Sequence, residues 1–202
     1  MSEQGPAEHD PSNDEGADDQ GAALLALYDE ALPQVYGYLA RRCPTTVLAE
    51  DLASETFMAA IGSIQRGAVR TVTTAWLITI ARNKLVDHWR RHEREQRGLQ
   101  LVHSVTATEQ GDEWSDEWLG GDALDLSCAL TVLHTLGPHH QAALSLRYLD
   151  GLSVRNVADH LNRTEHATEA LLVRARAAFR KGYAEALERS SDQRHETEEG
   201  ER

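Results

Sequence analysis

The sequence predicts an all-α protein in which two small helical domains are joined by an extended acidic linker. Apolar residues recur at three- and four-residue spacings in two separate blocks, which is typical of amphipathic helices. No run rich in Val, Ile and Tyr indicates a strand. Between the blocks lies an acidic segment without clear helix or strand periodicity, and long segments of that kind are uncommon inside a compact domain.

The composition sets the expected domain boundaries. Residues 1–21 and 188–202 are polar and acidic. We expect them to be disordered tails, because such segments bury too little apolar surface to offset their loss of conformational entropy. The helical domains are expected at residues 22–97 and 124–187, with the linker at 98–123.

The charge changes sign along the chain in the same pattern. The net charge is −13, which by itself argues against a nucleic-acid partner, because phosphate binding needs a basic surface. However, residues 41–97 carry +4 and residues 129–189 carry +2, whereas residues 98–128 carry −7. Two basic blocks separated by an acidic connector are compatible with nucleic-acid binding.

Two helices and a loop are expected at the start of the first domain. The first helix runs from about residue 22 to residue 44, with Pro33 as a bend or a break. The second helix follows Thr46. Gly62 and Gly67 are expected in the loop after it.

The third helix of this domain, expected at about residues 74–97, combines cations with aromatic rings. It carries these residues in turn: Trp76, Arg82, Lys84, His88, Trp89, Arg90, Arg91, His92 and Arg94. The pattern suits phosphate contacts together with stacking on unpaired bases. A solvated charged face over a packed helix explains the same residues, and this stretch alone leaves both interpretations open.

The second domain contains two short helices with the spacing of a helix-turn-helix motif. The segments 153–161 and 164–179 are amphipathic, and Ser153 and Thr164 are placed as N-caps. Asn162 can adopt the left-handed conformation that a sharp turn requires. Such a motif puts its second helix in the major groove of DNA, although an ordinary helical hairpin gives the same pattern. DNA is favoured by the cations after the turn: Arg174, Arg176, Arg180 and Lys181.

Together these residues resemble one known family, the extracytoplasmic-function (ECF) sigma factors of the sigma-70 type. The resemblance to conserved region 2 of that family lies in residues 49–57 (AEDLASETF) and 75–91 (AWLITIARNKLVDHWRR). Region 4 is resembled by residues 143–153 (ALSLRYLDGLS), followed by Val157-Ala158 and Arg174-Ala175-Arg176. The two blocks occur in the expected order and are separated by the expected linker.

The resemblance implies a function and a set of partners. A member of this family binds core RNA polymerase, at its β′ clamp helices and β flap, and directs promoter-specific transcription initiation at −10 and −35 elements. It is not an enzyme, uses no cofactor, and acts in the cytoplasm without membrane insertion. An anti-sigma factor usually holds it inactive. The acidic linker would follow the active-site cleft and RNA exit path, where a basic channel favours an acidic chain.

The resemblance also implies three sets of binding residues. Core polymerase would be bound by Asp51, Glu55 and Phe57. The −10 element would be contacted by Trp76, Arg82, Asn83, Lys84, Asp87, His88, Arg90 and Arg91. The −35 element would be contacted by Arg163, Thr164, His166, Thr168, Glu169, Arg174 and Arg176.

The recognition helix departs from the family pattern. Glu169 and Leu171 stand where the family usually has Lys and Arg, which removes attraction to phosphate. A carboxylate can nevertheless accept a hydrogen bond from cytosine N4. We therefore expect a −35 contact that is weaker or of unusual sequence.

Other functions find less support in the sequence. His88 and His92 have the spacing of two metal ligands, but no third ligand can be placed beside them, so no metal site is expected. Catalytic motifs and membrane-spanning apolar runs are absent, and Cys43 and Cys128 are expected to be free buried thiols. Two alternatives remain. A stand-alone helix-turn-helix regulator explains only the second domain, and a helical protein that sequesters a partner explains the acidic segments.

Overall fold

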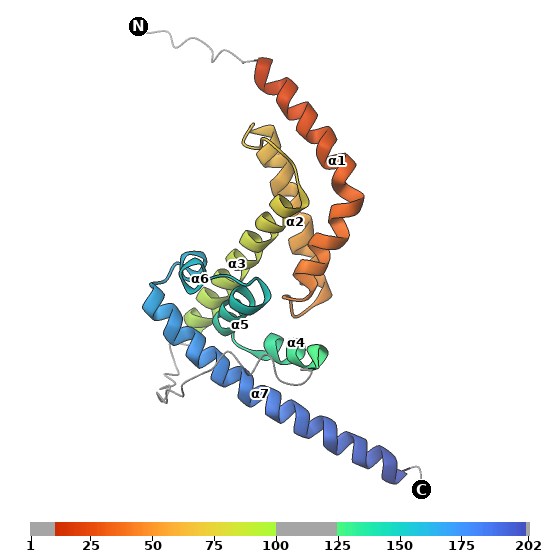
Figure 1. Cartoon of the computed structure of the whole chain (residues 1–202), viewed down its shortest axis with the longest axis vertical. Helices are drawn as coiled ribbons and strands as arrows, with labels where there is room; N and C mark the ends of the chain where they lie inside the picture. The colour runs from red at the N-terminus through yellow and green to blue at the C-terminus, as the bar shows by residue number, and fades with distance from the viewer. Residues whose placement is uncertain (1–10, 100–124, 201–202) are drawn as a thin grey trace. The chain divides into compact units, whose positions relative to one another are not determined.

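The computed structural model describes residues 11–99 and 125–200, and the elements within these ranges are helical, with no strand among them (Figure 1). In chain order they are α1 (Pro11–Ala40), α2 (Thr46–Gln65), α3 (Thr74–Leu99), α4 (Leu126–Thr135), α5 (Pro138–Leu144), a π-helical turn (Ser145–Leu149), α6 (Val154–Leu161) and α7 (Glu165–Gly200). The predicted all-α fold class is confirmed.

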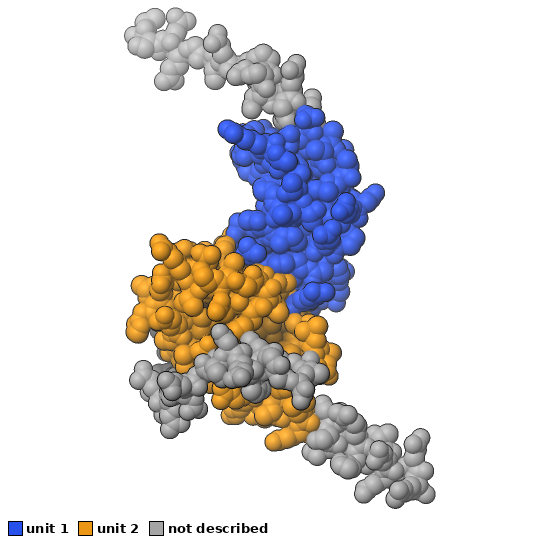
Figure 2. All heavy atoms as spheres, in the orientation of Figure 1, with its two compact units in different colours: residues 1–41, 45–84 blue, residues 42–44, 85–202 orange. Residues whose placement is uncertain are grey.

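The chain divides into two compact units, coloured blue and orange in Figure 2. Unit 1 comprises Met1–Arg41 and Thr45–Lys84, and unit 2 comprises Arg42–Pro44 and Leu85–Arg202. Helix α3 therefore contributes residues to both units. Most of the expected linker lies outside the described residues.

In unit 1, α1 packs against α2 through the apolar stripe that the sequence predicts. Val35 and Leu39 are fully buried, and the rings of Tyr28 and Phe57 lie 5.0 Å apart. Helix α2 is capped by Thr45, whose hydroxyl accepts a hydrogen bond from the backbone N–H of Leu48 at 3.3 Å. The helix thus begins at Thr46, one residue earlier than expected.

In unit 2, α7 is the central packing element and contacts α4, α5 and α6. One buried cluster joins Leu133, Leu144 and Ala175, and a second joins Ala143, Leu171 and Leu172. The second cluster also holds Val154 and Leu161 of α6, so it ties the two helices of the predicted motif to the core.

The helix-turn-helix geometry follows from three local features. The Ser153 hydroxyl accepts from the N–H of Asn156 at 3.2 Å, and the Thr164 hydroxyl accepts from the N–H of Ala167 at 3.2 Å. Between the two helices Asn162 is left-handed, with φ 53° and ψ 50°. Both predicted N-caps and the predicted turn residue are confirmed.

The helices are longer than the sequence pattern predicts. Helix α1 begins at Pro11 rather than near residue 22, and it continues through Pro33 without a break. Helix α7 extends to Gly200, and Gly62 lies inside α2 rather than in a loop. Once a helix has started, each further residue adds a hydrogen bond at little cost, so the apolar stripe underestimates helix length.

Candidate nucleic-acid interface

The first three turns of α7 have an outer face that is mostly uncharged or acidic. Glu165, His166 and Glu169 are exposed there, and the first exposed cation of the helix is Arg174. Arg176 is only partly exposed, and its guanidinium donates to the Tyr148 hydroxyl at 3.2 Å. Of the predicted −35 cations on this helix, Arg174 is therefore the one that the fold leaves at the surface.

One residue predicted to contact the −35 element, Thr168, faces the core, and so does Leu171, which was expected to remove a phosphate contact. Thr168 is fully buried, and its hydroxyl donates to the Thr164 carbonyl at 3.0 Å. Leu171 is also buried, in the cluster with Ala143 and Leu172. Thr168 is therefore a packing residue, and Leu171 removes no phosphate contact, because its position faces inward.

Helix α3 presents a mixed cationic face opposite a buried one. Leu77, Ala81, Leu85, Val86 and Trp89 are buried. The predicted −10 residues lie outside this stripe: Asn83, Asp87 and Arg91 are exposed, while Trp76, Arg82, Lys84, His88 and Arg90 are partly exposed. All eight are on the surface of one helix, as the sequence predicts. The Lys84 ammonium also lies 3.2 Å from the Glu55 carboxylate.

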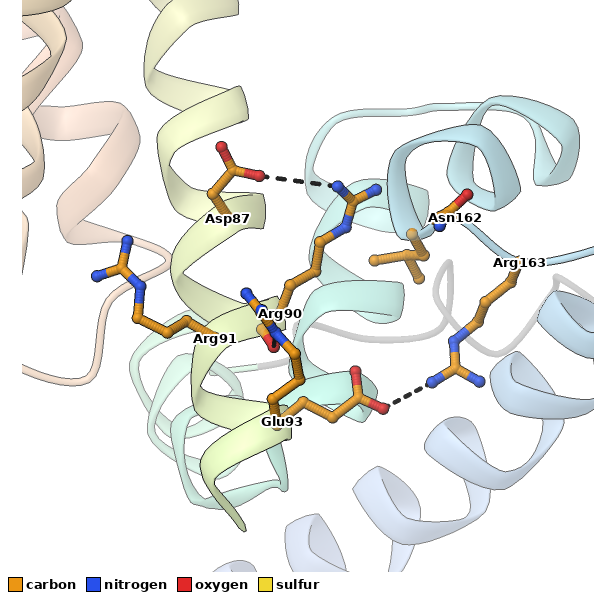
Figure 3. A pocket seen from close by; sticks show the side chains of 8 residues that line it. Asp87, Arg90, Arg91, Glu93, Asn162 and Arg163 are labelled. Atoms are coloured by element: carbon orange, nitrogen blue, oxygen red, sulfur yellow. Dashed lines mark hydrogen bonds and ion pairs between the residues drawn. The ribbon is translucent and has the colours of Figure 1, made fainter. Parts of the chain in front are cut away.

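In unit 2 a pocket of about 680 Å³ lies between the end of α3 and the turn after α6 (Figure 3). Its lining residues are Asp87, Arg90, Arg91, Glu93, Arg94, Leu161, Asn162 and Arg163. Four arginines against two carboxylates make it cationic, so its chemistry suits an anionic group such as a phosphate.

Protein acceptors already engage three of these arginines, and the Arg94 Nε donates to the backbone carbonyl of Arg90 at 3.1 Å. The Arg163 guanidinium donates to Glu93 at 2.7 Å, and the Arg90 guanidinium donates to the backbone carbonyl of His160. Arg90 also lies 3.7 Å from the Asp87 carboxylate. A dashed line in Figure 3 marks this ion pair. The Glu93 carboxylate also lies 3.3 Å from the Nδ1 of His139. DNA would have to compete with these contacts for Arg90 and Arg163.

Comparison with known proteins identifies both helical blocks. Residues 27–95 match the family profile Sigma-70 region 2, and residues 126–179 match Sigma-70, region 4. The chain is 31% identical over 169 residues to ECF RNA polymerase sigma factor SigL of Mycobacterium tuberculosis, covering 80% of this chain and 89% of SigL.

This chain belongs to the ECF family of sigma factors.

A further curated relative agrees with this assignment. ECF RNA polymerase sigma factor BldN of Streptomyces coelicolor is 33% identical over 154 residues, which cover 76% of this chain but only 57% of BldN. Among solved structures, the sigma factor RpoE in complex with the anti-sigma factor NepR from Bartonella quintana aligns with a TM-score of 0.47 and 22% identity, over 81% of this chain and 96% of RpoE. Sigma factors are initiation factors rather than enzymes, and the match to region 2 excludes a stand-alone helix-turn-helix regulator.

Within region 2 of this sigma factor, α2 carries an exposed face that sequence reasoning captured in part. Asp51 and Glu55, two of the residues predicted to bind core polymerase, lie on it. Phe57 does not, since it is 8% exposed and packs on Tyr28. The exposed apolar residues of this helix are Val47, Met58 and Ile61, and Met58 is 68% exposed. In the sequence, the spacing of these three residues from Asp51 and Glu55 already indicated that all five lie on one side of the helix.

Outside these surfaces, the described residues include a cysteine and a histidine with shifted pKa values. Both cysteines are free; Cys43 is buried and Cys128 is partly exposed, and burial raises the pKa of Cys43 to about 12, so its thiol stays protonated. Burial lowers the pKa of His140, and His139 and Arg174 act in the same direction. Among the residues whose side chains the structure describes, 19–95 and 125–189, no three His, Cys, Asp or Glu side chains gather as a metal site would require. No helix in these ranges has the length and apolar character to cross a bilayer.

Proposed function

We propose that this sigma factor binds core RNA polymerase and directs it to promoters that carry a −10 and a −35 element. The observation that carries the proposal is the presence of both DNA-reading regions, in family order, within one chain. We place this activity in the cytoplasm, where RNA polymerase and its promoters meet.

The exposed face of α2 is the proposed polymerase-docking surface, defined by Val47, Asp51, Glu55, Met58 and Ile61. Exposed apolar side chains flanked by carboxylates are typical of protein interfaces, where the apolar groups supply affinity and the charges supply orientation. The family resemblance implies that the β′ clamp helices are the partner at this surface. Contact between unit 2 and the β flap remains a prediction.

Helix α3 is the proposed −10 reader. Asn83 and Arg91 are exposed donors, and Trp76 is a partly exposed ring on the same helix. Melted DNA offers phosphates and unstacked bases, and cations beside an aromatic ring can bind both. Helix α7 is the proposed −35 reader, because a helix-turn-helix motif reads duplex DNA in the major groove.

Regulation by an anti-sigma factor is part of the proposal and rests on the family resemblance alone. Such a partner would compete with polymerase for the α2 face. We also propose that the acidic linker expected at 98–123 follows the active-site cleft and RNA exit path of polymerase.

Run-off transcription with core RNA polymerase tests the proposed function. The substitutions Arg91→Glu and Arg174→Glu change exposed cations of α3 and α7 into anions that phosphate repels. Each is expected to reduce run-off product roughly tenfold, from the loss of a phosphate contact plus the new repulsion. Arg189→Glu is the matched control, since this exposed arginine lies on α7 beyond the region 4 match.

The two substitutions should be separable by promoter. On a template truncated just upstream of the −10 element, which offers α7 no phosphates, the defect of Arg174→Glu should disappear, while that of Arg91→Glu should persist. Wild-type run-off no higher than with core polymerase alone, across a library of genomic promoters, would refute the proposed function.

A further inference from the structure

The core of unit 2 determines which side chains α7 can present to DNA. Thr164 caps the helix, and Thr168, Leu171, Leu172 and Ala175 are buried at three- and four-residue spacings. The helix therefore cannot rotate about its axis without exposing this stripe. The opposite side is the only one that can enter a groove.

That opposite side holds an unusual set of groups over its first three turns. The exposed residues after the N-terminal Glu165 are His166, Glu169, Ala170, Val173 and Arg174. Glu169 lies in the middle, with its side chain 62% exposed and its carboxylate 3.9 Å from the His166 ring. No exposed lysine or arginine precedes Arg174 on this helix, so the usual bidentate donor to guanine is absent from these turns.

We propose that Glu169 is a specificity-determining residue that selects cytosine in the −35 element. This inference rests on the proposed function, because it names the base that the same helix reads. An ionised carboxylate only accepts hydrogen bonds. In the major groove cytosine offers the N4 amino donor, whereas guanine offers the N7 and O6 acceptors and thymine the O4 acceptor.

Adenine is the one other base with a donor in the major groove, and it suits a carboxylate less well. Its N6 amino group lies beside the N7 acceptor, which repels a carboxylate oxygen. The expected order of preference at this position is therefore cytosine, then adenine, then guanine and thymine.

The neighbouring residues give the inference a second part. Ala170 and Val173 are exposed apolar side chains on the same face, and Val173 is 38% exposed. An apolar side chain in the major groove makes favourable contact with the thymine C5 methyl group. We expect a thymine next to the cytosine, on either strand.

The test uses holoenzyme reconstituted from core polymerase and the full chain, with a template library whose −35 region is randomised. Wild type should enrich cytosine at one position by roughly tenfold over guanine. Glu169→Gln should shift that position to adenine, since glutamine pairs with adenine N6 and N7. Glu169→Ala should abolish the preference at this position and leave the others intact.

Glu185→Gln is the matched control, because it makes the same chemical change on the same helix beyond the region 4 match. It should leave the base preference unchanged. Glu169 is exposed, so both of its variants should fold, and thermal denaturation checks this.

The outcomes separate this inference from the proposed function. Failure of wild-type holoenzyme to initiate on any template refutes the proposed function. Initiation with a −35 preference that Glu169→Gln and Glu169→Ala leave unaltered refutes the role of Glu169. A wild-type preference for an A·T base pair over a G·C base pair, in either orientation, at the position that responds to substitution also refutes it.

Discussion

At the scale of single residues, unit 2 contains a buried ion pair between Arg42 and Asp150. The guanidinium and carboxylate lie 2.5 Å apart, and the side chains are only 7% and 2% exposed. The Arg42 backbone carbonyl also accepts a hydrogen bond from the Gln141 amide at 2.9 Å. Arg42 is thus held through both its side chain and its backbone.

Removal of one partner of this pair should destabilise the protein strongly. In Asp150→Ala the guanidinium stays buried without its counter-charge, so the free energy of unfolding should fall by about 3–5 kcal/mol. Urea denaturation followed by circular dichroism measures the change. The control is Arg155→Ala, which breaks an exposed pair with Glu165 at 3.9 Å and should cost less than about 1 kcal/mol. Equal losses in the two variants would contradict the argument.

For single residues of the site, the sequence did not predict every side-chain orientation. The family resemblance named Asp51, Asn83, Arg91 and Arg174 as binding residues, and the fold leaves all four exposed. The burial of Thr168 was missed, because it depends on how far α7 is rotated toward its core. A hydroxyl is compatible with either face, whereas an arginine seldom lies inside without a partner.

At the scale of elements, the turn between α6 and α7 depends on one backbone conformation. Asn162 has φ 53° and ψ 50°, a region that costs most L-residues about 1–2 kcal/mol. Asn162→Ala should therefore lower the free energy of unfolding by about 1 kcal/mol, whereas Asn162→Gly should leave it unchanged or raise it slightly. Paired urea melts of the two variants check the sign. A similar loss of stability in both variants would show that the Asn162 side chain, rather than the backbone conformation, holds the turn.

The existence of the helices could be predicted from the sequence better than their ends. The existence of the helices was predictable, since each has an apolar stripe and several have a recognisable cap such as Ser153 or Thr164. The outer ends of α1 and α7 were not, because they lie beyond the apolar stripe. At Pro11–Gly21 and toward Gly200 the chain continues in helical form without the apolar pattern that marks a helix in the sequence.

At the scale of the whole molecule, the charge distribution bears on how the protein reaches DNA. The chain carries a net −13, so its long-range field repels a duplex even though two local blocks are basic. The cations of those blocks are also partly engaged: Arg163 binds Glu93, and Arg90 binds the His160 carbonyl. We expect the net negative charge and the engaged arginines to weaken binding of the isolated protein to promoter DNA.

We therefore expect the full chain alone to give no specific gel shift of a promoter duplex at physiological salt. With core polymerase, the same duplex should form a complex that a scrambled −35 element weakens. Lowering the salt should rescue only nonspecific binding by the isolated chain, because counterion release strengthens phosphate contacts without regard to sequence. A −35-specific complex of the chain alone would mean that α7 reads duplex DNA unaided, and that neither the acidic charge nor the occupied arginines limit access to the promoter.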